Sequence, residues 1–385
     1  MAQTTKYLKI FHRDILTVRS HQWKYYIEPY SGCAFRCTYC LYWQSSADAK
    51  CQKLKKDFVP SIASEISRMQ RKQIVYLGAT TDPYQELEKH ACFTRRILSE
   101  LIDKDLPVVI LTKSPLILRD SDLLQEIHKR HKLLVQFTLL TTNPGKACVL
   151  EQAAPSASER LKTASNLAQM GIPIHFHVSP LIPGLYEANE LNDTVRAIAD
   201  NGGQCIYSNI LGMRYRNTSV FFKSMEQLNP EAAARIRSEY KRDGHPNKNV
   251  YSPGFDFIYT EMLKLRDVCC RNRIDFICEF IPGLDEYNPS TFEKGIFRYG
   301  LPAVYQMTPL FSALSERMDW VCFCHKLKER FKGLDDEYLE LLKGFWDDGQ
   351  LFDNTKIGSE IVKKVRFYYK TRQMNSARGT ILSWD

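Results

Sequence analysis

Residues 29–43 of this 385-residue chain have the sequence PYSGCAFRCTYCLYW, in which Cys33, Cys37 and Cys40 are separated by three and then two residues. Three thiolates this close on one short loop can surround a [4Fe–4S] cluster, for which Cys thiolate is the usual ligand. Because the loop has no fourth Cys or His, one iron would stay open to bind a substrate or a cofactor. A zinc site, which usually takes four ligands, and three unrelated buried thiols are the alternatives.

The composition is that of an ordinary globular protein, with 44% hydrophobic and 12% aromatic residues. The longest apolar runs, such as VVIL at residues 108–111, are far too short to span a bilayer. The beginning of the chain, MAQTTKYLKIFHRD, lacks the apolar segment of a secretory signal. We therefore expect a cytoplasmic protein without a membrane partner, whose cysteines are thiols or metal ligands.

The chain has an excess of positive charge, with 53 basic and 44 acidic residues and a net charge of +9. Such an excess can favour a polyanionic partner such as a nucleic acid. The basic residues are scattered, however, and form local runs only at residues 53–56 and 363–372. An ordinary solvated surface explains the charge as well, so charge alone leaves nucleic-acid binding open.

Amphipathic stretches alternate with apolar runs along the first half of the chain. Helices are predicted over residues 59–72, 90–105, 120–132, 157–171 and 188–203. Buried strands are predicted over residues 73–83, 106–114, 133–143, 172–184 and 204–211. The strands are apolar throughout instead of alternating, which indicates a parallel sheet covered by helices. A Rossmann fold is disfavoured because no GxGxxG follows any of the strands.

The cysteine loop follows a first strand or arm in residues 1–30. We therefore predict an α/β fold: a partial (β/α)6 TIM-like barrel in residues 1–215, followed by a mostly helical C-terminal extension in residues 216–385 that selects the substrate. Each predicted strand ends in a polar tag: GATTD (78–82), TKS (112–114), TTN (141–143), SPLIPG (179–184) and SNILG (208–212). Any single tag is equally well explained as a turn. Together they predict an active site at the carboxyl edge of the sheet, near the cysteines.

The extension is less informative. Residues 224–242 predict one helix, and residues 255–280 predict a helix followed by a strand. Soft ligands gather in this half of the chain, and two interpretations are open, a second metal site or buried structural cysteines. The residues concerned are Cys269, Cys270, Cys278, Cys322, Cys324 and His325. The second interpretation is preferred, because the adjacent Cys269 and Cys270 point to opposite faces of any regular element.

The cysteine spacing resembles the signature of the radical SAM superfamily. Residues 77–101, 111–124 and 141–173 resemble, in order, blocks of the spore photoproduct lyase-like radical SAM proteins, often labelled DNA repair photolyases. This resemblance covers residues 29–212. It implies a [4Fe–4S] cluster and S-adenosylmethionine as cofactors, and a reductant of the flavodoxin or ferredoxin type. It also implies cleavage of S-adenosylmethionine to methionine and a 5′-deoxyadenosyl radical, which abstracts hydrogen from a substrate.

The resemblance further implies cofactor-binding residues. Cys33, Cys37 and Cys40 would hold the cluster, and Tyr39 would pack against adenine. Lys113 would meet the methionine carboxylate, which needs a positive charge. Without the resemblance, Tyr39 is equally consistent with a core aromatic residue and Lys113 with a solvated lysine.

Three more residues belong to the implied cofactor site. Thr138 and Thr141 would reach the ribose with their hydroxyls. Gly78 would allow the backbone to approach the methionine amino group closely. For each threonine, an ordinary structural hydroxyl is an equally good explanation.

The chain also departs from the family pattern. Photoproduct lyases place a hydrogen-donating Cys directly before a TSD-like turn, where this chain has Ala79, and the segment LKKDFVP (54–60) lacks their tyrosine pair. Cys148 is a candidate substitute donor, although an inert thiol is the simpler interpretation. The leading hypothesis is radical modification or repair of a nucleic-acid base. The alternatives are radical modification of a small molecule or peptide, and a non-catalytic Fe–S protein that binds or senses.

Overall fold

The apolar runs of the chain form the strands of one central sheet. The computed structural model describes residues 8–10, 25–42, 53–54, 58–67, 75–104, 108–130, 133–187, 189–214, 218–240, 250–253, 255–278, 319–322 and 324–325. The eight strands of this sheet have the order β1-β2-β5-β6-β7-β8-β9-β12. They span β1 Leu8–Ile10, β2 Tyr25–Ile27, β5 Val75–Leu77, β6 Val108–Thr112, β7 Leu133–Thr138, β8 Ile174–His177, β9 Gly203–Ser208 and β12 Asp275–Cys278.

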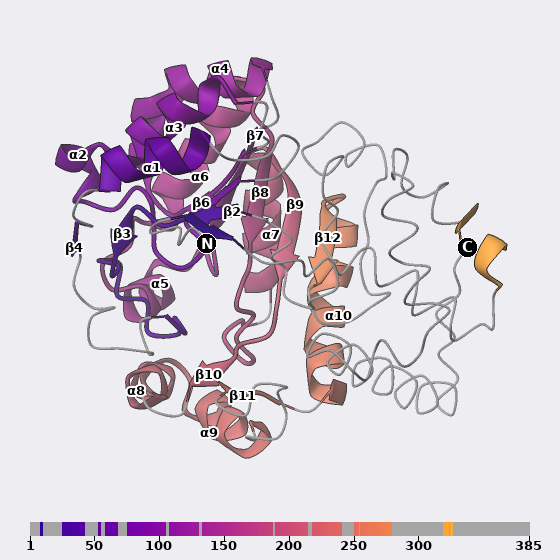
Figure 1. Cartoon of the computed structure of the whole chain (residues 1–385). Helices are drawn as coiled ribbons and strands as arrows, with labels where there is room; N and C mark the ends of the chain where they lie inside the picture. Colours follow the sequence, from indigo (N-terminus) through magenta and orange to yellow (C-terminus); the bar gives the residue numbers. More distant parts are fainter. Residues whose placement is uncertain are drawn as a thin grey trace.

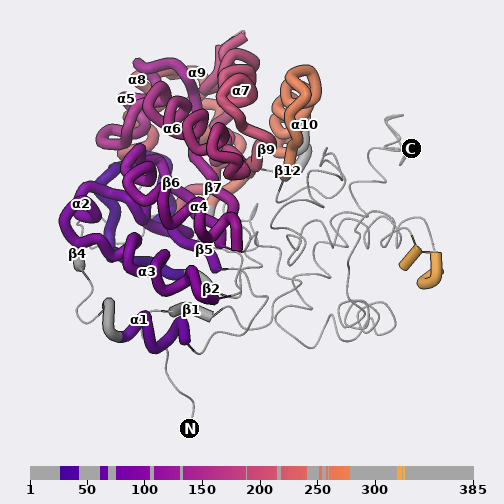
Figure 2. The backbone as a smooth tube through the Cα atoms, turned by 90° about the horizontal axis from the view of Figure 1, so that it is seen from above, coloured from indigo at the N-terminus to yellow at the C-terminus, as the bar shows by residue number. Residues whose placement is uncertain are grey.

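Within this sheet, β2, β5, β6, β7, β8, β9 and β12 run parallel to one another. The edge strand β1 pairs antiparallel with β2. Helices connect them and cover the outer face of the curved sheet, as Figures 1 and 2 show for α1, α3, α4, α6 and α7. This arrangement confirms the predicted partial barrel. Such parallel sheets are stable only when covered, which explains why their strands are continuously apolar.

The helices vary from one turn to almost five. They span α1 Phe58–Ser67, α2 Glu88–Ala91, α3 Phe93–Ile102, α4 Ser121–Arg130, α5 Pro144–Leu150, α6 Ala157–Gln169, α7 Glu190–Asp200, α8 Thr218–Leu228, α9 Pro230–Glu239 and α10 Phe255–Arg271. A 3-10 helix, η2 (Pro115–Asp120), precedes α4. Two short antiparallel pairs complete the described structure: β3 (Tyr30–Ser31) with β4 (Lys53–Leu54), and β10 (Met213–Arg214) with β11 (Val250–Tyr251). None of the described helices is long and apolar enough to cross a membrane.

The described residues form two large apolar cores. The larger lies between the sheet and the outer helices and contains alternate strand residues such as Val75, Leu77, Val135 and Ile206. The second core packs Phe35, Cys37 and Tyr39 against the loops that follow β7, β8 and β9 and against α5, α8 and α9. In Figure 1, α5, α8 and α9 lie below the sheet, opposite α3 and α4. The second core therefore packs the cysteine residues against the carboxyl edge of the sheet.

The predicted helix over residues 90–105 is in fact two helices. Cys92 adopts a left-handed conformation (φ 52°) and separates α2 from α3. The buried carboxylate of Glu88 then accepts hydrogen bonds from the backbone N–H groups of Thr94 (3.0 Å) and Arg95 (3.4 Å). These N–H groups have no intrahelical partner at the start of α3, so the Glu88 side chain satisfies them.

The predicted helix over residues 224–242 is also divided. It is replaced by α8 and α9, with Asn229 between them. Pro230 cannot donate a backbone hydrogen bond, and the Asn229 side chain accepts from the Ala232 N–H group at 3.0 Å. Proline at the first helical position behind an Asn cap is a start signal, and the helical periodicity of the segment hides it.

The sheet extends beyond residue 215, where we predicted the barrel domain to end. Helix α10 contacts α7, and the following strand β12 pairs parallel with β9. The helix and strand predicted over residues 255–280 are confirmed up to Cys278, but they add a strand to the sheet. Beyond residue 278 only residues 319–322 and 324–325 are described, so the predicted helical character of the remaining extension lies outside the described residues.

The outer side of the fold carries a buried ion network that ties helices together. We call Glu88, Arg95, Arg119 and Asp120 the helix-side network. Glu88 and Asp120 are fully buried, and Arg119 contacts both, at 2.7 Å and 2.8 Å. Arg95 contacts Asp120 at 3.0 Å, and Tyr30 donates its hydroxyl hydrogen to Glu88. Each buried carboxylate thus has an arginine partner.

Candidate functional site

The three cysteines lie on residues 32–42, which we call the cysteine loop. Gly32 (φ 79°) and Arg36 (φ 52°) take left-handed conformations that turn the chain back on itself. The Gln85 side chain holds the start of the loop, since its Oε1 accepts from the Ala34 N–H group (3.0 Å) and its Nε2 donates to the Gly32 carbonyl (3.1 Å). Gln85 follows β5, so the loop is fixed to the carboxyl edge of the sheet.

The far side of the loop is attached to α5. The Thr38 N–H group donates to the Leu150 carbonyl at 2.8 Å, and the Ala153 N–H group donates to the Phe35 carbonyl at 3.1 Å. Cys37 forms an isolated antiparallel bridge with Glu151. Residues separated by more than a hundred positions are thereby placed next to the thiols.

The three thiols interact electrostatically with one another. Cys37 is buried, whereas Cys33 and Cys40 are partly exposed. Burial raises the pKa of Cys33 to about 11, and burial also raises the pKa of Cys37, which the nearby charge of Lys113 only partly offsets. Thiols with raised pKa values are protonated at neutral pH, so a metal centre that binds here must displace protons.

The donor set fits a cluster better than a single ion. Among the described residues, no group of three or more Cys, His, Asp and Glu side chains can hold one metal ion. Sulfurs that bind three different irons of a cluster lie farther apart than sulfurs that share one ion, so this finding does not count against a cluster. Three thiols and no imidazole are the ligands expected of an Fe–S cluster. The same search finds no second metal site among the described C-terminal residues, where Cys269 is buried in the core and Cys270 is exposed.

Lys113 follows β6 and is fixed at its backbone by Asp82. The Asp82 carboxylate accepts from the Lys113 N–H group (2.7 Å) and from the Thr112 hydroxyl (2.8 Å). Burial raises the pKa of Asp82, while these hydrogen bonds lower it in part. The Asp82 carboxylate also acts electrostatically on Cys33, whose pKa it raises. Asp82 therefore lies close to both the first cysteine and Lys113.

The Lys113 ammonium group belongs to a second buried ion network. We call Tyr39, Lys113, Glu151 and Arg160 the cysteine-loop network. Glu151 accepts a hydrogen bond from the Tyr39 hydroxyl, lies 2.5 Å from the Arg160 guanidinium and 3.8 Å from Lys113 Nζ. Lys113 Nζ lies 5.9 Å from the centre of the Tyr39 ring. Four side chains from four different segments thus meet beside the cysteine loop.

Electrostatics keeps this network ionised. Burial raises the pKa of Glu151, but the charges of Arg160 and Lys113 outweigh burial and leave the pKa below its usual value. Burial lowers the pKa of Lys113, but the neighbouring Cys37 and Glu151 outweigh it and leave the pKa above its usual value. One carboxylate and two cations give these four side chains a net charge of +1, which suits an anionic ligand, and burial raises the pKa of the neighbouring Asp82 carboxyl, which weakens its negative charge.

The other predicted cofactor residues lie at the same edge of the sheet. Thr138 ends β7 and Thr141 follows it, and both side chains are buried. Gly78 follows β5 with φ 87°, and a Cβ atom there would lie 2.4 Å from the Leu111 carbonyl oxygen. The close approach to the neighbouring strand is therefore enough to explain the glycine, without a contact to the cofactor. The assignment of these three residues to S-adenosylmethionine stays a prediction.

Cys148 lies on α5 and is exposed, whereas Lys146 and Leu150 on the same helix are buried. The thiol therefore lies on the solvent side of the helix. This placement gives no support to its predicted role as a hydrogen donor.

A row of side chains crosses the inner face of the sheet next to Lys113. Register pairs Thr138 of β7 with His177 of β8, and His177 with Tyr207 of β9. The His177 and Tyr207 rings lie 4.6 Å apart, centre to centre. His175, two residues earlier on β8, is buried, and burial lowers its pKa to about 3. No sequence signal singled out this row, because strand residues that face inward look like any other strand residues.

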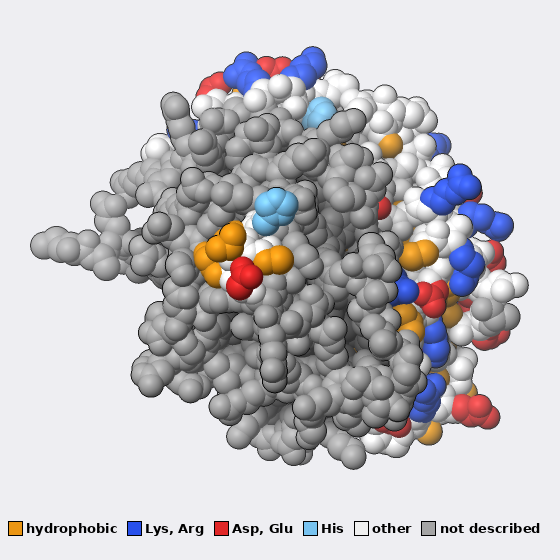
Figure 3. Space-filling view, turned by 90° about the vertical axis from the view of Figure 1, so that its right-hand side faces the viewer, with side chains coloured by type: hydrophobic (Ala, Val, Ile, Leu, Met, Phe, Trp, Pro, Cys, Tyr) orange, Lys and Arg blue, Asp and Glu red, His pale blue; other side chains and the backbone are white. Residues whose placement is uncertain are grey.

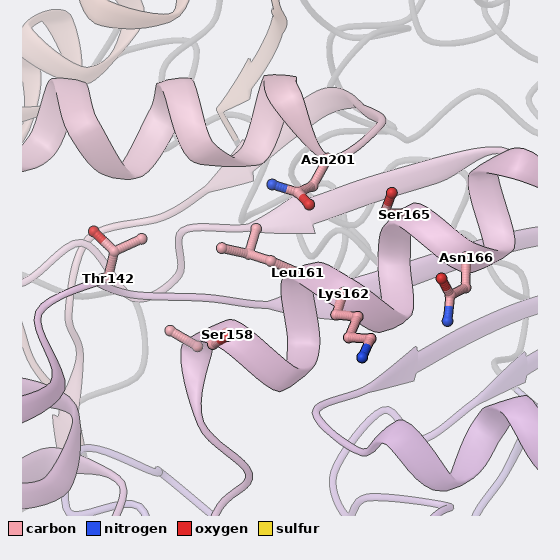
Figure 4. A pocket seen from close by; sticks show the side chains of 8 residues that line it. Thr142, Ser158, Leu161, Lys162, Ser165, Asn166 and Asn201 are labelled. Atoms are coloured by element: carbon pink, nitrogen blue, oxygen red, sulfur yellow. The ribbon is translucent and has the colours of Figure 1, made fainter.

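A surface cavity of about 360 Å³ lies elsewhere, between α6 and the end of α7. Thr142, Ser158, Lys162 and Asn201 are among its lining residues, and Figure 4 shows them around the groove. It lies on the helix-covered exterior. Among the described residues on the face of Figure 3, basic and acidic side chains are interspersed. The positive net charge is therefore not gathered into one patch on that described surface.

Comparison with known proteins identifies the class of this fold and site. Residues 27–198 match the family model of the radical SAM superfamily. That segment contains the cysteine loop, Lys113 and the cysteine-loop network, so the candidate site lies within the part of the chain that matches the radical SAM superfamily.

The fold is similar to that of spore photoproduct lyase. The structure of spore photoproduct lyase complexed with dinucleoside spore photoproduct has a TM-score of 0.53 and 14% sequence identity, and the match covers 72% of this chain and 80% of that chain. The structure of a cysteine-to-serine mutant of the same lyase has a TM-score of 0.52, 14% identity and coverage of 70% and 80%. Identity at this level establishes the shared fold alone.

Two sequence relatives are more similar in sequence. An uncharacterized protein of Mycobacterium tuberculosis is 27% identical over 254 residues, which cover 63% of this chain and 72% of the relative. An uncharacterized protein of Methanocaldococcus jannaschii is 31% identical over 169 residues, which cover 43% of this chain and 62% of the relative. These relatives support the family without adding a substrate.

Proposed function

We propose that this protein is a radical SAM enzyme whose cluster is bound by Cys33, Cys37 and Cys40. The observation that supports this best is the position of Lys113 beside a loop of three thiols, at the carboxyl edge of a radical SAM domain. When bound, a reduced [4Fe–4S] cluster supplies the electron that cleaves S-adenosylmethionine to methionine and a 5′-deoxyadenosyl radical, which abstracts hydrogen from the substrate. A flavodoxin- or ferredoxin-type protein is the proposed source of that electron.

The residues of the chain would bind and orient the cofactor. Lys113 would pair with the carboxylate of S-adenosylmethionine. Its ammonium group lies 3.8 Å from Glu151, which is beyond hydrogen-bonding distance, whereas Arg160 contacts Glu151 at 2.5 Å. Tyr39 would contact adenine, and Thr138 and Thr141 would contact the ribose. The second apolar core around Phe35 and Tyr39 would exclude water from the thiols.

For the substrate we propose a nucleic-acid base, modified or repaired through hydrogen abstraction. Two observations support this choice: the similarity of fold to an enzyme solved with a dinucleoside photoproduct, and the net charge of +9. The absence of a Cys at Ala79 and of tyrosines in residues 54–60 argues against repair of spore thymine dimers by the known donor route. A small molecule or a peptide is the alternative substrate.

The first test uses protein purified without oxygen, reconstituted with iron and sulfide and reduced with dithionite. We expect a brown protein that converts S-adenosylmethionine to 5′-deoxyadenosine. Lys113→Met should raise the Kd for S-adenosylmethionine about 10- to 100-fold with the iron content unchanged. Lys162→Met, at an exposed position on α6, is the matched control and should bind like the natural protein.

The same experiment distinguishes a radical enzyme from a zinc protein and from a non-catalytic Fe–S protein. A colourless protein that holds zinc would exclude the radical enzyme. A cluster without cleavage of S-adenosylmethionine would favour a non-catalytic protein that binds or senses.

The second test concerns the substrate. We expect single- or double-stranded DNA to bind with an affinity that falls steeply as salt is raised, because phosphate contacts release counterions. Binding of DNA that does not respond to salt, or no binding, would favour a small-molecule or peptide substrate.

A further inference from the structure

We propose that Glu151 is a positioning residue that couples the cysteine loop to cofactor binding, with Arg160 as its fixed counter-ion. The inference rests on the proposed function, since it concerns how Lys113 is presented to S-adenosylmethionine. Glu151 would not touch the reacting atoms. It would act by holding Tyr39 and Lys113.

The contacts of Glu151 link the parts of the site. Its backbone is bridged to Cys37, and its carboxylate accepts from the Tyr39 hydroxyl, two residues further along the same loop. The same carboxylate lies 3.8 Å from Lys113 Nζ, which comes from the end of β6. A movement of the cysteine loop therefore changes the surroundings of Lys113 through a single side chain.

Arg160 fixes Glu151 in this position. The residue is only 1% exposed, and besides contacting Glu151 its guanidinium donates to the Thr138 carbonyl (2.9 Å) and to the Pro155 carbonyl (2.6 Å). The Thr138 carbonyl lies at the end of β7, next to the predicted ribose-binding hydroxyl. Arg160 is thus anchored at three points and cannot move away from Glu151 without losing buried hydrogen bonds.

The charges explain why the pairing of Arg160 with Glu151 favours binding of an anionic cofactor by Lys113. The 2.5 Å contact between Arg160 and Glu151 neutralises the carboxylate, so that Lys113 at 3.8 Å is oriented by Glu151 and remains able to pair with a second anion. If Glu151 paired with Lys113 alone, the carboxylate of S-adenosylmethionine would have to compete with a buried anion. The carboxylate and two cations together present the one positive charge that an anionic ligand requires.

The proposal is tested by removing the carboxylate without changing the net charge of the cysteine-loop network. The variant Glu151→Gln alone leaves two buried cations without a partner, which threatens folding. The double variant Glu151→Gln/Arg160→Met removes one charge of each sign and keeps Lys113. Each protein is reconstituted, its iron is counted, and the Kd for S-adenosylmethionine is measured by equilibrium dialysis.

We expect the double variant to bind iron like the natural protein and to bind S-adenosylmethionine about 10- to 100-fold more weakly. The electron paramagnetic resonance spectrum of the reduced cluster, which responds to a ligand at its open iron, should change less at a given cofactor concentration. Glu151→Asp keeps the negative charge, so its Kd for S-adenosylmethionine should lie between those of the natural protein and the double variant.

Asp120→Asn is the control, because it breaks a second buried ion network that has no contact with Lys113 or Glu151 among the ion pairs of the described residues. A double variant that binds S-adenosylmethionine within twofold of the natural protein would overturn the proposal, and so would an equal loss in Asp120→Asn. If the natural protein itself binds no S-adenosylmethionine, the proposed function fails and the positioning role fails with it.

Discussion

The protein contains two buried ion networks made of the same kinds of side chain, and they differ in charge balance. In the helix-side network, the buried carboxylates of Glu88 and Asp120 face Arg95 and Arg119, and Arg95 also pairs with the exposed Asp122 at 2.7 Å, so that every cation has a carboxylate within 3.0 Å. In the cysteine-loop network, Glu151 alone faces Arg160 and Lys113. Burying any charge costs free energy, and a balanced set recovers most of it within the protein.

The difference in balance corresponds to a difference in position. The helix-side network joins α2, α3 and η2 on the outer side of the sheet, where its pairs can do no more than hold the helices together. The cysteine-loop network lies at the carboxyl edge, where an incoming anion can complete it. A buried lysine whose carboxylate partner lies 3.8 Å away, beside the cysteine loop, thus indicates a binding site, whereas cations that all have a carboxylate within 3.0 Å indicate a structural role.

The largest expected effect comes from the thiols that only the second region contains. Cys40→Ala should abolish cluster binding and with it the formation of 5′-deoxyadenosine, because a cluster held by two thiols is not retained. Cys270→Ala, at an exposed position on α10, is the matched control and should keep full iron content. Iron and sulfide analysis measures both. If Cys40→Ala kept its cluster and its activity, the ligand assignment would be wrong.

Breaking the helix-side network should cost stability and leave the cofactors unaffected. Asp120→Asn removes a fully buried carboxylate that pairs with two arginines, and we expect the free energy of unfolding to fall by about 3–5 kcal/mol. Denaturant unfolding of the cluster-free protein measures the loss. A stability unchanged within error would contradict the structural role assigned to this network.

Substitution of two glycines compares the carboxyl edge of the sheet, where the site lies, with the opposite edge. Gly78→Ala places a Cβ atom 2.4 Å from the Leu111 carbonyl oxygen at φ 87°, and should destabilise the protein by about 3 kcal/mol. Gly171→Ala, after α6, has a similar φ of 80° but no atom within 4 Å, and should cost only about 1 kcal/mol. Thermal unfolding compares the two variants, and equal losses would show that the close approach at Gly78 is unimportant.

The smallest expected effect is the loss of stability at acidic pH that His175 causes. Burial lowers the pKa of His175 to about 3, so between pH 6.5 and pH 3 the unfolded chain binds a proton that the folded chain does not. Stability should therefore fall as the pH drops, with a loss of about 2 kcal/mol between pH 7 and pH 5 from this residue. His175→Gln should flatten the stability profile over that interval. An unchanged slope in the variant would assign the acid sensitivity to other groups.

The general plan of the fold was predictable because it depends on local patterns. Continuous apolar strands alternating with amphipathic helices indicate a covered parallel sheet, and this pattern placed the starts of β5 to β9 within two residues, whereas the predicted ends also took in the polar loops that follow. Helix breaks were missed where a distant or hidden group decides them. At Cys92 the decisive group is the buried Glu88 carboxylate, which replaces the missing backbone partners at the start of α3.

What the sequence by itself determined is a loop of three cysteines, whose spacing resembles the radical SAM signature, followed by apolar strands that end in polar residues. These features are local, because cluster ligands on one short loop must be close together in the chain. What only the tertiary structure decided is the arrangement around Lys113. Tyr39 and Glu151 are separated by 112 positions and meet because the cysteine loop pairs with the end of α5. No local pattern encodes such a contact, since it arises when separate segments bury their charges together.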